Sequence, residues 1–197
     1  MTIERPKVVV LAGPNGAGKT TSAAQLLLGA LKVHEFVNAD TIAQGLSAFA
    51  QERVAFEAGR IMLTRLKELA TARASFAFET TLATRSYAPW LAELRTAGYR
   101  VHLVFLWLPN ADVAVARVTA RVRLGGHGVP EATVRRRYES GLANFFDLYM
   151  PLADNWRIID NGTNGRPRLV AVGRIGRDAR IKDPQRWQSI LSSVRRK

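Results

Sequence analysis

Segments of continuous apolar character alternate along the chain with segments in which apolar positions recur three or four residues apart. Residues 100–108 form the strongest apolar run, as expected of a central strand that is buried on both faces. Residues 51–72 have the helical spacing, with one predicted buried face made of Val54, Ala58, Ile61, Met62, Leu66 and Leu69. Further strands are predicted at 8–11, 35–38, 75–79, 156–160 and 168–172, and further helices at 20–27, 87–97, 109–124, 184–194 and from 130 onward. This alternation predicts an α/β fold around a mainly parallel sheet.

Composition and charge narrow the class of protein. The 197 residues suit one domain, and the absence of cysteine excludes disulfides, a thiol nucleophile and cysteine-ligated zinc. Neither an apolar leader nor a bilayer-length run is present, so we expect a cytoplasmic protein without a membrane partner. The net charge of +13 favours polyanions such as nucleotides, nucleic acid or an acidic protein, although the basic tail also suits a merely solvated surface.

A complete phosphate-binding loop follows the first apolar run. Residues 13–20 read G-x-x-x-x-G-K-T, with a predicted strand before them and a predicted helix after them. Gly16 and Gly18 allow the backbone to wrap its N–H groups around an anion, and the helix N-terminus adds positive charge. Lys19 is expected to reach the β- and γ-phosphates and Thr20 to ligate Mg²⁺. The predicted ATP-binding residues are Gly13, Pro14, Asn15, Gly16, Ala17, Gly18, Lys19, Thr20 and Thr21.

Two further predicted strands end in acids, where ligands bind in α/β sheets of this kind. Asp40 suits a catalytic base that accepts the proton of a substrate hydroxyl, with a helix N-cap as the structural alternative. Glu79 suits a contact to a substrate hydroxyl or to the water shell of Mg²⁺, with an exposed strand-end acid as the alternative. The predicted substrate-binding residues are Asp40, Glu79, Thr80, Thr81 and Arg85.

A group of arginines flanks a glycine-rich break at residues 125–128. Arg117 and Arg121 lie one helical turn apart and can face the same side. A helix, a flexible hinge and a second helix with arginines on both sides are typical of a lid that closes over a nucleotide. Either arginine is predicted to stabilise the charge on a transferring phosphoryl group, and the sequence leaves the choice between them open.

The ordered combination of these motifs resembles the zeta toxin family of P-loop kinases. The resemblance covers about residues 7–161 and is carried by residues 12–21, 36–40, 78–81 and 125–131. It implies a three-layer P-loop NTPase or kinase fold with a helical lid, ATP and Mg²⁺ as cofactors, Asp40 as base and Glu79 as a sugar contact. Characterised members phosphorylate the 3′-hydroxyl of the sugar in UDP-N-acetylglucosamine and are often inhibited by an antitoxin. Here the second lid arginine has no clean counterpart, and the chain is compact.

Alternative functions stay open at this point. Transporter ATPases share the letters of the loop, but their Leu-Ser-Gly-Gly-Gln signature is absent from the sequence. A kinase of another metabolite, an antibiotic or a nucleic-acid 5′ end remains possible, as does a non-catalytic module that binds an acidic antitoxin. Residues 1–161 are predicted to form the kinase domain, with 162–197 as a basic C-terminal extension packed on it.

Overall fold

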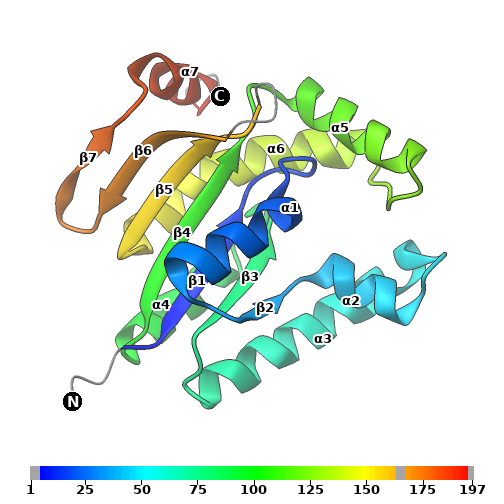
Figure 1. Ribbon diagram of the computed structural model, residues 1–197, viewed down its shortest axis with the longest axis horizontal. Helices are drawn as coiled ribbons and strands as arrows, with labels where there is room; N and C mark the ends of the chain where they lie inside the picture. Colours follow the sequence, from blue (N-terminus) through cyan, green and yellow to red (C-terminus); the bar gives the residue numbers. More distant parts are fainter. Residues whose placement is uncertain (1–4, 163–166, 195–197) are drawn as a thin grey trace.

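The structure, a computed structural model, describes residues 5–162 and 167–194 of the chain. Seven strands form one sheet in the order β2-β3-β1-β4-β5-β6-β7 (Figure 1). The strands are β1 (Lys7–Ala12), β2 (Glu35–Val37), β3 (Phe76–Thr80), β4 (Arg100–Trp107), β5 (Asn155–Asp160), β6 (Arg168–Arg174) and β7 (Arg177–Ile181). The first five strands pair in parallel, whereas β6 and β7 are antiparallel additions. The predicted mainly parallel α/β fold is confirmed.

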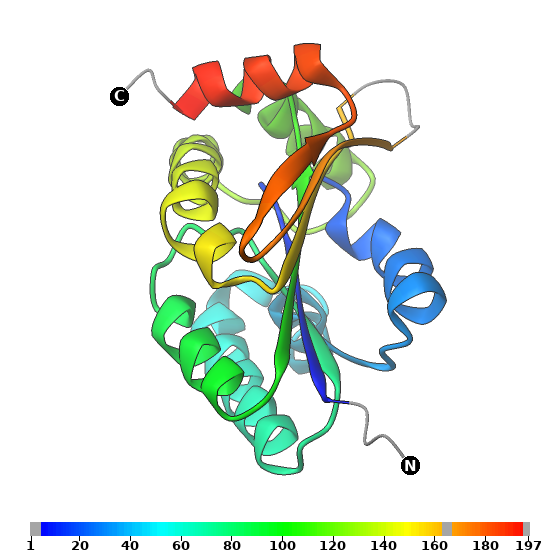
Figure 2. The ribbon, with the colours of Figure 1, turned by 90° about the vertical axis from the view of Figure 1, so that its left-hand side faces the viewer.

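Helices cover the two faces of the sheet and make three layers (Figure 2). The α-helices are α1 (Lys19–Ala24), α2 (Ala39–Leu46), α3 (Gln51–Thr71), α4 (Tyr87–Thr96), α5 (Ala111–Arg123), α6 (Glu131–Asn144) and α7 (Pro184–Val194). Short π and 3₁₀ turns occupy η1 (Gln25–Leu31), η2 (Phe145–Tyr149) and η3 (Met150–Leu152). One buried cluster joins α3, α4, α6 and α7 to the sheet, and a second joins α1, η1 and α5 to its other face.

The predicted helix at 51–72 matches α3, but its buried face is narrower than expected. Ala58, Met62, Leu66 and Leu69 are buried, whereas the side chain of Ile61 is 40% exposed. The apolar positions of α3 span a wide arc of the helix surface. Because β2 is only three residues long, the strand covers only part of that arc. Strand β7 was not predicted, because four of its five residues are exposed and no apolar run marks it.

The topology places the carboxyl end of β1 between those of β3 and β4. The chain returns from β1 to β2 and β3 on one side, and then crosses to β4 on the other. Such a reversal of strand order opens a crevice beyond the strand ends. The phosphate-binding loop follows β1 at this point, and the side chains described next gather around it.

Candidate functional site

The loop from Gly13 to Lys19 needs glycine for two separate reasons. Gly16 and Gly18 both have φ of 78°, a left-handed conformation that favours glycine. A Cβ on Gly13 would lie 2.3 Å from the carbonyl oxygen of Leu106, and one on Gly16 would lie 2.9 Å from that of Ala114. The loop is therefore clamped between the end of β4 and the side of α5, with Gly18 as the N-cap of α1. Gly16 and Gly18 therefore have the backbone conformation that was expected, and their role in binding an anion stays a prediction.

Lys19 is a buried cation held by both backbone and acid. Its side chain is 5% exposed, and its Nζ donates to the carbonyl oxygens of Gly13 at 2.9 Å and Pro14 at 3.0 Å. Nζ also lies 3.5 Å from Oε1 of Glu79. Burial lowers the pKa of Lys19, while the negative charges of Glu79 and Asp40 raise it. An uncompensated buried ammonium would be costly, so Glu79 is the partner that lets a cation stay beneath the loop.

Glu79 connects three strand ends at the floor of the site. Its Oε2 accepts hydrogen bonds from the Thr20 hydroxyl at 2.8 Å and from Nδ2 of Asn38 at 2.8 Å. Nδ2 of Asn38 also donates to Oγ1 of Thr20 at 3.3 Å. Glu79 comes from β3, the neighbour of β1 in the sheet, and Asn38 directly follows β2. The carboxylate therefore lies beside the hydroxyl that was predicted to ligate Mg²⁺.

Asp40 lies in the first turn of α2, at the mouth of the same site. The N-cap of this helix is Asn38, whose Oδ1 accepts from the backbone N–H of Asp40 at 2.8 Å. The capping alternative for Asp40 is thereby excluded, and its exposed carboxylate is free of that task. Asn38 was not singled out from the sequence, although it stands two residues before Asp40 immediately after an apolar run.

The two predicted lid arginines differ in their contacts. Arg117 bridges two backbone segments, since its Nη1 donates to Gly16 at 3.4 Å and its Nη2 to Gly162 at 3.3 Å. Arg121 has buried Nε and Nη2 atoms with no hydrogen-bond partner among the described residues. Its positive charge acts on Lys19 and lowers the pKa of that lysine. A buried guanidinium with unmet donors beside a second cation has the chemistry of an anion site.

A cleft of about 420 Å³ joins these groups. It is lined by Asn15, Gly16, Gly18, Lys19, Thr20, Thr21, Asn38, Asp40, Thr41, Gln44, Gln51, Glu79, Arg117, Arg121, Gly125, Gly126 and His127. Among the other predicted site residues, Gly13, Pro14 and Ala17 are buried members of the loop itself. Thr80 and Thr81 lie beyond Glu79, where their hydroxyls accept from the backbone N–H groups of Leu82 and Ala83. Arg85 is exposed and does not line the cleft.

A larger groove of about 810 Å³ adjoins the cleft and shares Asn38 and Thr41 with it. It runs along β2, the edge strand of the sheet, and under α3. Its walls combine the aromatic side chains of Phe36 and Phe56 with the charged side chain of Arg60. The lining also includes Glu35, Glu57, Glu68 and Arg65, so the groove offers apolar surface and charges of both signs next to Asp40.

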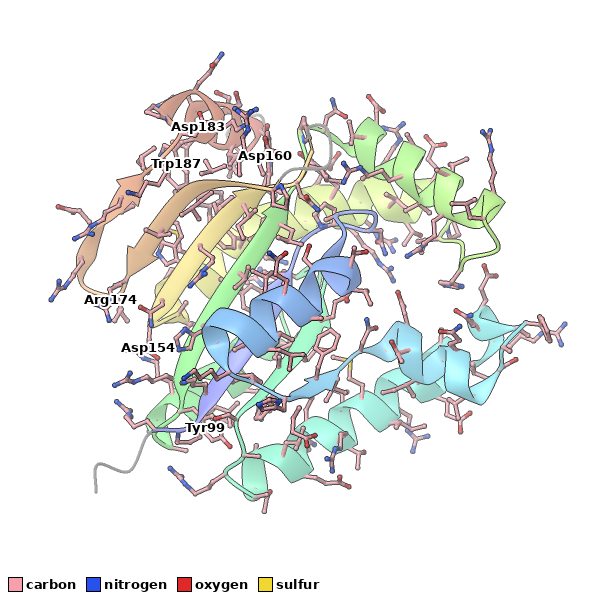
Figure 3. All side chains as sticks on the ribbon, in the orientation of Figure 1. Tyr99, Asp154, Asp160, Arg174, Asp183 and Trp187 are labelled. Atoms are coloured by element: carbon pink, nitrogen blue, oxygen red, sulfur yellow. The ribbon has the colours of Figure 1, made fainter. Side chains whose placement is uncertain are left out.

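The segment after β5 also reaches the loop, which the sequence did not predict. Nδ2 of Asn161 donates to the carbonyl oxygen of Ala17 at 2.7 Å, and Gly162 accepts from Arg117. Asp160, 1% exposed, accepts from the N–H of Gly162 at 2.7 Å and pairs with Arg186 of α7. Figure 3 shows Asp160 close to the start of α7, where Asp183 also lies. The C-terminal helix is thus connected through one turn to the phosphate loop.

The fold and the site define a P-loop protein. Residues 8–145 match the AAA domain family, and the chain belongs to this family. A protein of Haemophilus influenzae described as uncharacterized is 26% identical over 132 residues, which are 67% of this chain and 92% of that protein. The described residues include no helix with both the length and the apolar character that a membrane crossing needs.

Two solved complexes share the fold at low sequence identity. The AvrRxo1-ORF1:-ORF2 complex with ATP gives a TM-score of 0.78 at 19% identity, covering 96% of this chain and 64% of that one. This chain therefore spans slightly less than two thirds of that neighbour. The PezAT chromosomal toxin-antitoxin system of Streptococcus pneumoniae gives a TM-score of 0.62 at 13% identity, covering 85% and 72% of the two chains. These likenesses establish the fold alone.

Proposed function

We propose that this protein is an ATP-dependent phosphotransferase of the zeta toxin type, which transfers the γ-phosphoryl group of ATP to a hydroxyl of a small substrate. The observation that carries the proposal is one cleft lined by the phosphate loop, Asp40 and Arg121, whose buried Nε and Nη2 have no hydrogen-bond partner among the described residues. Binding of a triphosphate alone would not need an exposed acid opposite the loop. Transfer to a hydroxyl does need one.

The residues present fit ATP and Mg²⁺. The left-handed glycines shape the loop that leads into the N-terminus of α1, where backbone N–H groups favour an anion. Arg121, whose buried Nε and Nη2 have no partner among the described residues, provides a second cation for phosphate oxygens. Thr20 and Glu79 offer oxygen atoms, the ligand type that Mg²⁺ prefers. We infer that Thr20 would ligate the ion and that Glu79 would hold its water shell. When bound, Mg²⁺ supplies Lewis-acid neutralisation of the charge on the phosphates.

Asp40 is proposed to take the proton of the acceptor hydroxyl as the oxygen of that hydroxyl attacks the γ-phosphorus. The new O–P bond forms while the bond from γ-phosphorus to the β,γ-bridging oxygen breaks, and that oxygen leaves as part of ADP. Arg121 and Lys19 stabilise the charge that spreads over the phosphoryl oxygens in the transition state. Arg117 fixes the position of the loop relative to residues 160–162, through its hydrogen bonds to the carbonyl oxygens of Gly16 and Gly162.

The adjoining groove is where we place the rest of the acceptor. It meets the cleft at Asn38 and Thr41, so a molecule lying on Phe36 and Phe56 could present a hydroxyl to Asp40. UDP-N-acetylglucosamine, the acceptor implied by the resemblance to zeta toxins, is the first candidate. Thr80, Thr81 and Arg85 stay predicted substrate contacts, which only a bound acceptor can test.

The experiment incubates the protein with ATP, Mg²⁺ and a panel of UDP-sugars, small metabolites and 5′-hydroxyl oligonucleotides, and reads phosphate gain by mass spectrometry. Asp40→Asn should keep the ATP affinity of the wild type and lose about 10²- to 10⁴-fold in kcat, because the general base is gone. Asp147→Asn, at an exposed acid remote from the cleft, is the matched control. Full transfer by Asp40→Asn would refute its assignment as base. No phosphorylated product from any acceptor would refute the kinase proposal.

The most specific rival is a nucleotide-dependent binding module for a protein such as an antitoxin, in keeping with the toxin-antitoxin system among the structural neighbours. An antitoxin is also the protein partner that we propose for the kinase. The same variant separates the two functions. If the protein is a binding module, the Asp40→Asn variant should keep the effect of the wild type on cells. If it is a toxic kinase, the variant should lose that effect in parallel with its kcat.

A further inference from the structure

Among the described residues, no helix packs on one face of β6 and β7. On the side of α1, the buried cluster draws residues from β1, β3, β4 and β5, but none from the described residues of β6 or β7. Figure 1 shows the same arrangement, since α1 lies over β1 and β4 while β5, β6 and β7 are open toward the viewer. A hollow of about 320 Å³ lies on this face.

The hollow is lined by hydrogen-bond donors that carry positive charge. Four arginines contribute to it, namely Arg157, Arg174, Arg177 and Arg180, against the single acid Asp178. Strand register explains the gathering, because Arg174 pairs with Arg177 and Val172 pairs with both Arg157 and Arg180. Directly paired residues point to the same face of a sheet. The arginines therefore form one surface although they come from three strands.

These arginines are poorly neutralised within the described chain. The side chains of Arg157, Arg177 and Arg180 have no ion pair or hydrogen bond there, and the Nε of Arg174 donates only to the neutral Oδ1 of Asn155 at 3.0 Å. His102, on the same face, has a buried Nε2 without a partner among the described residues. Burial, followed by the positive charges of Lys7 and Arg157, lowers the pKa of His102. The local field on this face is thus positive.

We propose that this bare face, defined by Arg157, Arg174, Arg177 and Arg180, binds the phosphate backbone of nucleic acid independently of base sequence. Guanidinium groups match phosphate oxygens in a bidentate manner, and their spread over three strands suits an extended polyanion more than one small anion. The described lining holds one aromatic side chain, Trp156, which is 8% exposed and packs in the cluster on the opposite face. Bases would therefore find no stacking platform.

The bare face lies away from the phosphate-transfer cleft. His102 and Arg157 sit toward the amino ends of the parallel strands, and from His102 to the end of β4 is roughly 17 Å at the rise of an extended strand. Figure 3 places Arg174 and Asp160 at opposite ends of this part of the sheet. Nucleic acid bound here would tether the protein without presenting a 5′ end to Asp40, so this inference goes beyond the proposed kinase function and does not depend on it.

The test measures fluorescence anisotropy of a labelled 20-nucleotide single strand of mixed sequence at several KCl concentrations. The double variant Arg177→Gln/Arg180→Gln removes two exposed cations from the bare face. Arg53→Gln/Arg136→Gln removes two exposed cations elsewhere and is the control with the same change in net charge. Wild type and control should bind alike. The bare-face variant should bind about tenfold or more weakly, with a salt slope shallower by about 1.4, the value for two lost phosphate contacts.

Three results would overturn the inference. One is the absence of binding by the wild type at 50 mM KCl. Another is equal binding by the bare-face variant and its control, which would mean that binding depends on the net charge of the protein and not on this face. The third is displacement of the oligonucleotide by polyglutamate of equal charge at equal or lower concentration, which would assign the face to an acidic protein. Circular dichroism of both double variants verifies that neither has lost its fold.

Discussion

The two ends of the central sheet carry positive charge in opposite ways. At the carboxyl end, Lys19 is buried, donates hydrogen bonds to two backbone carbonyls and forms an ion pair with Glu79. On the bare face toward the amino ends, Arg177 and Arg180 are exposed and have no acid partner in the described chain. A cation without water must be compensated by the protein, whereas an exposed one is compensated by solvent and salt. The first arrangement suits one small anion in a fixed pose, and the second suits a polyanion held loosely.

The largest effect is expected at Arg121, whose buried Nε and Nη2 find no partner in the part of the chain that the structure describes. Arg121→Ala should lower kcat by about 10³-fold, because a guanidinium aimed at a transferring phosphoryl group acts mainly in the transition state. Arg117→Ala should cost about tenfold, since Arg117 contacts backbone carbonyls instead. Steady-state kinetics with ATP checks the pair. A larger loss at Arg117 than at Arg121 would reverse their proposed roles.

A smaller effect is expected at Glu79, and its signature is pH dependence. Glu79→Gln should weaken Mg²⁺ affinity by about 10- to 100-fold, the range for groups that orient a metal's ligands. It also removes the main charge that raises the pKa of Lys19, so that pKa should fall further. ATP affinity, which needs the ammonium form, should then be lost at a lower alkaline pH than in the wild type. Titrations with ATP from neutral to alkaline pH, with Mg²⁺ and with chelator, separate the two contributions.

The sign of the accompanying stability change follows from the same pKa. Burial makes the pKa of Lys19 lower in the folded than in the unfolded state, so the unfolded chain binds more protons between the two values. Stability therefore rises with pH through that window. The window should widen in Glu79→Gln, as denaturant unfolding at a series of alkaline pH values would reveal. An unchanged window would mean that Glu79 does not compensate the buried ammonium.

The smallest effect is expected at the turn that links α7 to the loop. Asn161→Ala removes one hydrogen bond to Ala17 and should weaken ATP binding by only a few-fold, about 1 kcal/mol. Arg136→Gln, an exposed change elsewhere on the chain, should leave ATP affinity within error. Calorimetric titration of both variants is the check. Equal affinities for Asn161→Ala and the wild type would mean that the turn only packs against the loop.

The sequence predicted much of this molecule because its strongest signals are local. The apolar run of β4, the glycine pattern of the loop and the spacing in α3 each report on a few neighbouring residues, and all three elements formed as predicted. Strand β7 was not predicted, because its exposed arginines carry no periodic apolar signal. The contacts of Asn161 and Arg186 were not predicted, because their partners, Ala17 and Asp160, lie 144 and 26 residues away in the chain. The division into a kinase domain and a basic extension stays a prediction, and so do the cytoplasmic location and the roles of the individual site residues.

The sequence by itself determined that a strand, a glycine-rich turn and a helix would meet at residues 13–20, since that geometry follows from local backbone preferences. Only the tertiary structure distinguished the contacts of the two lid arginines, because Arg117 has carbonyl partners whereas the buried Nε and Nη2 of Arg121 have none among the described residues. It also decided that the arginines of β5, β6 and β7 share one face, because strand register is a pairing between distant segments. Local chemistry can be read along the chain, whereas partnership of charges depends on which segments the fold brings together.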